Sequence, residues 1–437
     1  MIKLYHSITK AGEKPLTWLL KWRTSKGKED PSRLHERMGS PQVPRPEGAL
    51  VWVHAASVGE AQSTLILIER LLRDNENLHV LLTTGTLGSA QFLAPKLPAR
   101  CIHQFYPLDH PAWVAQFLDH WQPQLALWME SELWPNMLAA IKQRNIIAAL
   151  VNARLSYKSY KSWNLFKKHA AELLSTFHII LAQTGRDEAY FTDLGAGGNI
   201  IVTDNLKYSA RALPADEAQL KILSGATLGR KIWLYASSHE GEEYITCRLH
   251  QILKNRIPDL LTIIVPRHPD RREDIAKTIE SHRLKYTIRG TALTPPGPDD
   301  DIYLADTFGE LGLFYRLAPL ACIGRSFSRD GGGGHNPIEA AQLHCGVLHG
   351  PHVQFQQDIF DEMDREGAAL RISDEAHFRQ VLEQLLTEDS ALTELQEKAA
   401  AYAAGKTAVI DRVMEGLSPL LTRVGIEQKA PPQKAAS

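Results

Sequence analysis

Four consecutive glycines, Gly331 to Gly334, follow a short apolar run in the second half of the chain. The run, Leu320–Ile323, predicts a buried strand, and the glycines allow the following backbone to take positive φ and expose its amides. Asn336 then predicts a helix N-cap, with Glu339 three residues later as its partner in a capping box. Free amides and the positive end of a helix dipole at one point predict an anion site suited to a phosphate.

A helix with a capping box after a flexible turn is the other interpretation of this segment. That interpretation does not require four glycines, nor the basic residues Arg325, Arg329 and His335 that flank them. The local chemistry therefore favours phosphate binding over a purely structural turn.

Glu60 occupies a comparable place in the first half of the chain. It follows the apolar run Leu50–His54, and Gly59 allows a tight turn before Glu60 begins a helix. The helix dipole favours the ionised form of a carboxylate in the first turn by about 0.3–1 kcal/mol. An ionised carboxylate in a cleft can act as a general base, and an ordinary acidic residue at a helix start is the alternative.

Further polar residues follow the predicted strands of the first half. Glu130 and Glu132 come after one strand, and Arg154 follows the next. Because parallel strands end at one edge of a sheet, where doubly wound folds bind ligands, these residues and Glu60 are expected on one rim. The two carboxylates could share a substrate hydroxyl or hold a neighbouring base; alternatively, the segment simply starts a helix before Pro135.

The second half of the chain repeats this arrangement. Ser238 follows an apolar run and precedes an acidic helix start, and Arg267 and His268 leave the next strand between two prolines. The prolines stiffen the backbone around this Arg-His pair, which suits a phosphate or a base edge, although a lone histidine is more often structural. Lys207 follows the last strand of the first half, near the predicted hinge, from where it could reach across an interdomain cleft.

The composition argues against nucleic-acid binding and against a metal site. The 437 residues include 49 basic and 50 acidic side chains, so no global field points to nucleic acid. The four cysteines lack CxxC spacing and the histidines lack HExxH spacing, which predicts reduced thiols and no metal site. Asp299–Asp301 resembles an acidic metal motif, but its position after a Pro-rich loop and before a strand favours a solvated turn.

Short apolar strands and amphipathic helices alternate in two series, separated by Tyr208–Arg230, where the pattern pauses. This alternation predicts an α/β protein with two doubly wound, Rossmann-like domains in tandem and a cleft between them. The predicted domains cover residues 31–212 and 213–405, followed by a helical segment at 406–426. The small and polar tail, 427–437, is expected to be disordered.

Residues 1–30 combine basic and apolar side chains. Before Glu29, seven lysines and arginines accompany a single acidic residue, Glu13, and they alternate with leucines, Trp18 and Trp22. This pattern is typical of a segment lying in the headgroup layer of an anionic membrane. A short amphipathic helix docked on its own domain is the alternative. No apolar stretch approaches the roughly 20 residues of a membrane-spanning helix.

Eight ordered blocks of sequence resemble the Kdo (3-deoxy-D-manno-oct-2-ulosonic acid) transferases of Gram-negative bacteria. The blocks are HAASVGE, MESELWPN, VNARLS, DNLK, SSHEGEE, PRHP, DTFGELGLFY and GGGGHNPIEAA, and they lie within residues 50–370. The resemblance implies a GT-B glycosyltransferase, with two Rossmann-like domains facing across a cleft and a C-terminal helix at 406–426 returning to the first domain. It also implies a CMP-Kdo donor, a lipid A precursor such as lipid IVA as acceptor, inversion of the anomeric centre, and no metal or other cofactor.

Carried onto these blocks, the resemblance implies that Glu60 is the catalytic base, which takes the proton of a glucosamine 6-hydroxyl. The implied donor-binding residues are Lys207, Ser238, Arg267, His268, Gly333, Gly334, His335, Asn336 and Glu339. The implied acceptor-side residues are Ser57, Glu130, Glu132 and Arg154. We therefore expect a peripheral enzyme on the cytoplasmic face of the bacterial inner membrane, whose partners are CMP-Kdo, a lipid A precursor and the anionic membrane surface, and not nucleic acid.

Two residues depart from the family pattern. Asp204 begins the DNLK block where glycine is usual, and Arg325 stands where many members have a second glycine. A GT-B transferase with another nucleotide sugar or acceptor is an alternative function, as is a GT-B-fold nucleotide-sugar epimerase or a non-catalytic sugar-nucleotide binder. Such epimerases act on soluble UDP-sugars, so the basic, Trp-bearing N-terminus favours a lipid acceptor.

Overall fold

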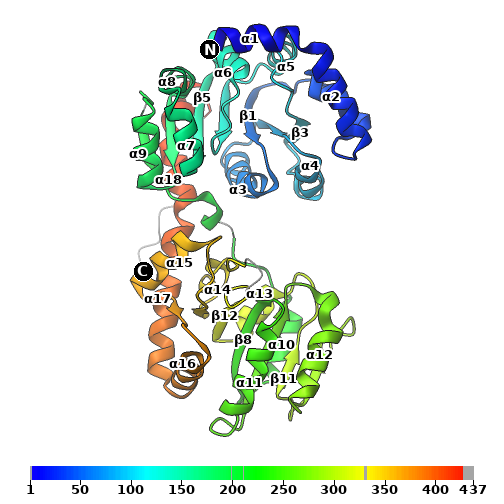
Figure 1. Cartoon of the computed structure of the whole chain (residues 1–437), viewed down its shortest axis with the longest axis vertical. Helices are drawn as coiled ribbons and strands as arrows, with labels where there is room; N and C mark the ends of the chain where they lie inside the picture. Colours follow the sequence, from blue (N-terminus) through cyan, green and yellow to red (C-terminus); the bar gives the residue numbers. More distant parts are fainter. Residues whose placement is uncertain (1, 198, 210, 329–331, 427–437) are drawn as a thin grey trace. The chain divides into compact units, whose positions relative to one another are not determined.

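The computed structural model describes residues 2–197, 199–209, 211–328 and 332–426, and it divides into two compact units (Figure 1). The first unit comprises Met1–Ala210 and Ala408–Ser437, and the second comprises Arg211–Thr407. Each contains one seven-stranded sheet whose paired strands are parallel, which confirms the predicted α/β class. The tail predicted to be disordered lies outside the described residues.

The sheet of the first unit has the strand order β3-β2-β1-β4-β5-β6-β7. Its strands are β1 Ala49–Ala55, β2 Leu78–Thr84, β3 Cys101–Phe105, β4 Leu125–Met129, β5 Ile147–Ala153, β6 Ile179–Ala182 and β7 Asn199–Val202. The strand order reverses between β1 and β4, so this unit has its topological switch point there.

Helices cover both faces of this sheet (Figure 1). They are α1 Ile2–Ala11, α2 Glu13–Ser25, α3 Val58–Asp74, α4 Leu87–Leu93, α5 Pro111–Trp121, α6 Pro135–Gln143, α7 Tyr157–Asn164, α8 Lys167–Leu174, α9 Gly185–Asp193 and α18 Val409–Arg423, with short 3₁₀ helices at Pro31–Met38, Ala94–Lys96 and η3, Leu206–Ser209. Successive residues of β1 enter opposite cores: Val51 and Val53 pack with α3 and α18, whereas Leu50 and Trp52 pack with α5 and α6.

The second unit repeats this architecture with the strand order β10-β11-β9-β8-β12-β13-β14 and a switch point between β8 and β12. Its strands are β8 Lys231–Ser238, β9 Leu260–Pro266, β10 Tyr286–Ile288, β11 Ile302–Leu304, β12 Leu320–Ile323, β13 Gly346–His349 and β14 Leu370–Arg371. Its helices are α10 Glu217–Ala226, α11 Glu242–Leu253, α12 Arg272–Ser281, α13 Leu311–Leu317, α14 Ile338–Ala341, α15 Gln357–Glu366, α16 Glu375–Thr387 and α17 Asp389–Thr407, with a 3₁₀ turn at Pro269–Arg271.

The structure contains two elements that were not predicted from the sequence, a helix and a strand. The predicted pause at Tyr208–Arg230 contains α10, a helix that Asp216 caps by accepting the N–H groups of Ala218 and Gln219. The strand β3 was not predicted because it is an edge strand, in which Ile102 and His103 are only half-buried and the apolar run is interrupted.

The basic N-terminal segment forms two helices, of which α1 packs on α5 and α6 (Figure 1). Asn136, the second residue of α6, fixes it: its Nδ2 donates to Thr9 Oγ1 at 2.9 Å and its Oδ1 contacts His6 Nδ1 at 3.0 Å. Leu4, Ile8, Trp18, Leu19 and Trp22 nevertheless stay exposed. The segment is thus docked on its own unit and still presents an apolar surface.

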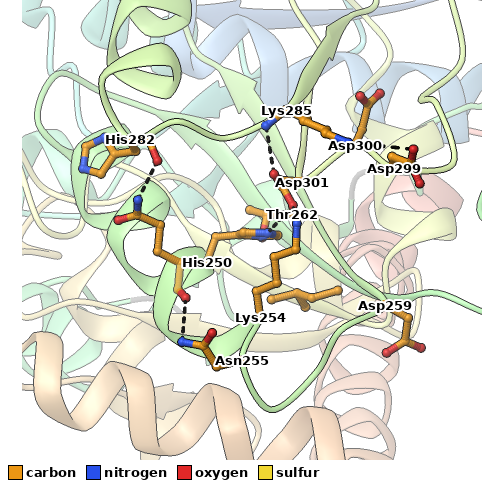
Figure 2. Close-up of polar contacts among 12 residues, drawn as sticks. His250, Lys254, Asn255, Asp259, Thr262, His282, Lys285, Asp299, Asp300 and Asp301 are labelled. Carbon is orange, nitrogen blue, oxygen red and sulfur yellow. Dashed lines mark hydrogen bonds and ion pairs between the residues drawn. The ribbon is translucent and has the colours of Figure 1, made fainter.

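Asp301 is a buried link between elements of the second unit (Figure 2). Its carboxylate pairs with Lys254, which directly follows α11, lies 3.4 Å from Nε2 of His250 in α11, and accepts the N–H of Lys285 at 2.8 Å. The predicted solvated turn is therefore wrong for this residue. The chain uses its charge to tie α11 to the strands β10 and β11, and the pKa of Asp301 is lowered because these bonds outweigh its burial.

Candidate active site

Glu60 lies in the first turn of α3, just beyond the carboxyl end of β1. Ser57 caps this helix: its Oγ accepts the N–H of Glu60 and donates to Glu60 Oε1 at 2.8 Å, while Glu60 Oε2 accepts the N–H of Ala56 at 2.7 Å. This is a capping box, so the structural interpretation of Glu60 is correct. A carboxylate offers about four lone-pair positions, so the same carboxylate can still accept a proton from a bound hydroxyl.

Glu130 lies at the same switch point, directly after β4. It has a φ of 58°, in the left-handed region that non-glycine residues rarely adopt. Burial and the charge of Glu60 raise its pKa, whereas Lys207 and Arg154 oppose this shift. The charges of three residues that were predicted from separate segments thus act on Glu130, and we call Glu60, Glu130, Arg154 and Lys207 the Glu60 cluster.

Lys207 was predicted to bind the donor, and it lies in the first unit beside the first turn of α3. A Cβ built on Gly59 would be 3.6 Å from Lys207 Nζ. The turn η3 carries this lysine, and Asn152 at the end of β5 holds the turn by accepting the N–H of Leu206 at 2.9 Å. No role was predicted for Asn152 from the sequence. A polar residue near the end of an apolar strand is the feature that could have indicated one.

Glu132 does not join Glu130, although a shared hydroxyl was one prediction for the pair. Its Oε2 lies 3.5 Å from His54 Nε2 and accepts the indole N–H of Trp134 at 2.9 Å. Burial raises the pKa of Glu132, but the bonds to His54 and Trp134 outweigh it and leave that pKa low. The other prediction, that one of the two carboxylates holds a neighbouring basic side chain, fits the contact between the Glu132 carboxylate and the His54 ring.

The glycine segment of the second unit differs from its prediction. The N–H groups of Gly333 and Gly334 donate to the carbonyl of Arg325, at 3.3 and 3.1 Å, and the N–H of His335 donates to the carbonyl of Gly324 at 3.3 Å. Because the segment folds back onto the loop after β12, these three amides are not free, and the predicted nest of amides is wrong for them.

A one-turn helix follows this segment. The helix α14 begins at Ile338 and has four residues, so it carries little of the predicted macrodipole. The N-cap residue is Pro337, and not Asn336 as was predicted. Asn336 nevertheless bonds to this helix start: its Oδ1 accepts the N–H of Ile338 at 3.1 Å, and its Nδ2 donates to Glu339 Oε1 at 3.2 Å. Burial raises the pKa of Glu339, opposed by Asn336 and by the charge of Arg267, so Arg267 and Glu339 belong to one neighbourhood.

Histidines and arginines gather at the switch point of the second unit. Nε2 of His239 lies 3.0 Å from Nε2 of His335, and the His268 ring lies 5.8 Å from that of His239. Burial lowers the pKa of His335 to about 4, helped by the positive charges of its neighbours, which include Arg267 and Arg325. We call His239, Arg267, His268 and His335 the histidine cluster; its donors suit an anion such as phosphate. His239 had no predicted role.

Glu242 organises the loop that borders the histidine cluster. Its carboxylate accepts the N–H groups of Arg325 and Phe327, both at 2.9 Å, and of His239 at 2.8 Å. Ser238, by contrast, was predicted to bind the donor, but it is buried and its Oγ donates to Glu243 Oε1 at 2.8 Å. Its hydroxyl thus supports the start of α11.

Among the described ranges of the chain, no three His, Cys, Asp or Glu side chains are placed to share a metal ion. Within those same ranges, none of the helices has both the length and the apolarity to cross a membrane.

The two sheets and their switch points match a known class of structure. The UDP-GlcNAc 2-epimerase from Neisseria meningitidis, solved with UDP-GlcNAc bound, aligns with a TM-score of 0.53 at 14% identity, over 85% of this chain and 100% of that one. The chain therefore has the GT-B fold of glycosyltransferases and such epimerases.

Sequence comparison identifies the family. A family model described as 3-deoxy-D-manno-octulosonic-acid transferase (kdotransferase) matches residues 32–210. The 3-deoxy-D-manno-octulosonic acid transferase of Rickettsia felis is 34% identical over 85% of this chain and 80% of that protein, and that of Bordetella pertussis is 33% identical over 95% and 99%. The chain belongs to the Kdo transferase family, the glycosyltransferases of lipopolysaccharide biosynthesis, which confirms the resemblance.

The two departures from the family pattern have a shared geometry. Asp204 has a φ of 75° and Arg325 has a φ of 61°, so both non-glycine residues take the left-handed conformation that a glycine adopts without strain. Each follows a strand, β7 and β12 respectively. Strained residues of this kind collect at functional sites, and here they shape the loops beside Lys207 and beside the histidine cluster.

Proposed function

We propose that this enzyme transfers Kdo from CMP-Kdo to a lipid A precursor such as lipid IVA, with inversion at the anomeric carbon and without a metal ion or other cofactor. The Glu60 cluster carries this proposal, because a buried carboxylate, a second carboxylate and two cations meet at a switch point of the sheet. Membership of the family supplies the sugar that is transferred.

In the proposed reaction, Glu60 is the base. The acceptor's glucosamine 6-hydroxyl attacks the anomeric carbon of Kdo, its proton passes to Glu60, and the bond from that carbon to the CMP phosphate breaks. Glu60 is suited to this role because its capping box fixes the carboxylate before the acceptor arrives. Glu130, Arg154 and Ser57 lie around it and would orient the acceptor or stabilise the oxocarbenium-like transition state.

The histidine cluster is the proposed site for the departing CMP. Arg267 can neutralise the charge of a phosphate as the glycosidic bond breaks, and ring N–H groups of the histidines can donate hydrogen bonds to it. Glu339 is placed near Arg267, where it could hold a ribose hydroxyl. Gly333 and Gly334, whose φ values are 127° and 72°, let the loop approach this site closely. We retain Lys207 as a donor-binding residue in this proposal.

The proposed location is the cytoplasmic face of the bacterial inner membrane, as a peripheral protein. The helices α1 and α2 carry Lys3, Lys10, Lys14 and Lys21, and Trp18 and Trp22 are 67% and 44% exposed. Exposed indoles among cations suit a layer of anionic headgroups.

Mass analysis of the product tests this function. The enzyme is incubated with CMP-Kdo and tetraacylated lipid A precursor in the presence of EDTA, and the product is expected to gain one or more Kdo residues. Recovery of unchanged acceptor, with transfer restored only by a divalent ion, would contradict the metal-free mechanism. In a parallel test, CMP should raise the melting temperature and UDP should not; stabilisation by UDP would favour the epimerase-like alternative.

A further inference from the structure

An apolar pocket of about 310 Å³ lies in the first unit, apart from the Glu60 cluster. Its lining comes from α1, from the segment between β4 and α6, from the first residue of α6, and from α7 and α8: Tyr5, Leu133, Trp134, Pro135, Trp163, His169 and Leu173. The volume is about twice that of an engineered cavity that takes up benzene, so it can hold a stretch of hydrocarbon.

Part of the polar surface around this pocket is already engaged within the protein. The indole N–H of Trp134 donates to Glu132 at 2.9 Å, and burial together with the nearby charge of Asp109 raises the pKa of the Tyr5 hydroxyl. His169 also has a partner within the protein. Carbon surface therefore dominates the lining, which suits a hydrocarbon and not a sugar or a nucleotide.

One loop connects this pocket to the Glu60 cluster. The five residues between β4 and α6 supply Glu130 to the cluster and Leu133 and Trp134 to the pocket. A ligand that places a hydroxyl near Glu60 and an alkyl chain in the pocket would thus contact both ends of the same short loop.

The surface around the pocket is both apolar and basic, so it suits a ligand that has apolar and negatively charged parts. Leu165 and Phe166, between α7 and α8, are 81% and 48% exposed. Basic residues on the lining helices and beside them could meet phosphate groups: Lys3, Lys10, Lys158, Lys161, Lys167 and Lys168. Apolar side chains within a basic surface are the complement of a lipid that carries both acyl chains and phosphates.

We propose that this pocket binds one acyl chain of the acceptor and so selects an acylated acceptor over its deacylated backbone. The proposal rests on the proposed function, because it takes the acceptor to be a glycolipid. The chain would be held by burial of methylene groups, each of which contributes to affinity as it leaves water.

Filling the pocket tests this proposal. Leu133→Trp places an indole in the pocket, and Leu228→Trp makes the same substitution at a leucine that is 87% exposed in the second unit, as a matched control. The quantity measured is the ratio of kcat/KM for tetraacylated acceptor to kcat/KM for the deacylated acceptor. Loss of two methylene contacts predicts a fall in this ratio of about tenfold or more in Leu133→Trp, and little change in Leu228→Trp. Equal ratios in the wild type and Leu133→Trp would overturn the proposal.

A binding measurement separates this proposal from the proposed function. A monomeric brominated fatty acid is added to the wild type, to Trp163→Phe and to Trp18→Phe, and quenching of tryptophan fluorescence is followed. Saturable quenching that Trp163→Phe reduces and Trp18→Phe preserves would support the pocket, even if no acceptor were glycosylated. Quenching that depends on Trp18 alone, or none at all, would overturn the pocket and leave Kdo transfer intact.

Discussion

Glu130 lies within range of the charge of Glu60, and burial together with that charge raises the pKa of Glu130. Lys207 and Arg154 counteract this shift. The two carboxylates come from segments 70 positions apart, after β1 and after β4, and only the strand reversal between these neighbouring strands brings them together. The balance of two negative and two positive charges at this point leads to the first prediction.

Lys207→Ala is expected to lower activity and to move the acidic limb of the pH–rate profile to higher pH. Removal of the cation takes away a positive charge that opposes the raised pKa of Glu130, so this pKa rises further and a higher pH is needed to keep the Glu130 carboxylate ionised beside the base. The measurement is kcat/KM against pH. A profile that keeps its acidic limb while activity falls would remove Lys207 from the electrostatics of the cluster.

Arg267→Ala is expected to weaken CMP binding by about tenfold or more, since hydrogen bonds to charged groups contribute roughly 1.5–3 kcal/mol. Calorimetric titration with CMP measures the effect. Lys277→Ala, on the exposed face of α12, is the control; its side chain is 74% exposed and pairs only with exposed Asp274. Unchanged CMP affinity in Arg267→Ala would exclude this residue from the phosphate site.

His335 predicts a dependence of stability on pH. Its folded-state pKa is about 4, below the ordinary 6.5, so between these values the unfolded chain binds more protons. The free energy of unfolding should therefore fall as the pH is lowered from about 6.5 to 4. His335→Asn should show a smaller fall over this window in denaturant titrations. An identical pH dependence in both proteins would contradict the assigned burial of the ring.

Asp204→Gly is expected to stabilise the first unit by up to about 1 kcal/mol, because glycine adopts a φ of 75° without the strain of a Cβ. The ion pair lost with Arg412 is long, at 3.7 Å, and partly exposed, so it contributes little. Asp204→Gly and Asp204→Ala both lose the hydrogen bond that Asp204 Oδ1 accepts from the N–H of Asn205, but only Asp204→Ala keeps the Cβ. The expected order of melting temperatures is Gly, Asp, Ala, and a lower value for Gly than for Ala would refute this account.

The sequence predicted the two parallel sheets because their central strands are continuous apolar runs, and it placed Glu60, Glu130 and Arg154 on one rim because each follows such a strand. It could not predict that Glu132, two residues after Glu130, pairs with His54, since this depends on how the loop turns at a φ of 58°. The prediction of free amides in the glycine segment was wrong for a related reason. Glycines that can expose their N–H groups can equally fold back, so that these groups donate to the carbonyl of Arg325.

The functional residues that the sequence did not predict are those that hold the loops and side chains of the site in place. Asn152, Glu242 and His239 bond to main-chain groups or to other side chains, so their roles depend on tertiary contacts. A polar residue at the end of a buried strand, as with Asn152, is the one sequence signal that could have identified such a support.

The central claim is that Glu60 removes the proton from the acceptor, and Glu60→Gln tests it most directly. Glutamine can replace glutamate in a capping box, so the start of α3 should survive while the base is lost. Glu69→Gln, on the exposed face of the same helix, is the control. In single-turnover transfer from CMP-Kdo, Glu60→Gln should react about 10²–10⁴-fold more slowly with unchanged CMP affinity and melting temperature. A rate near that of the wild type would contradict the account.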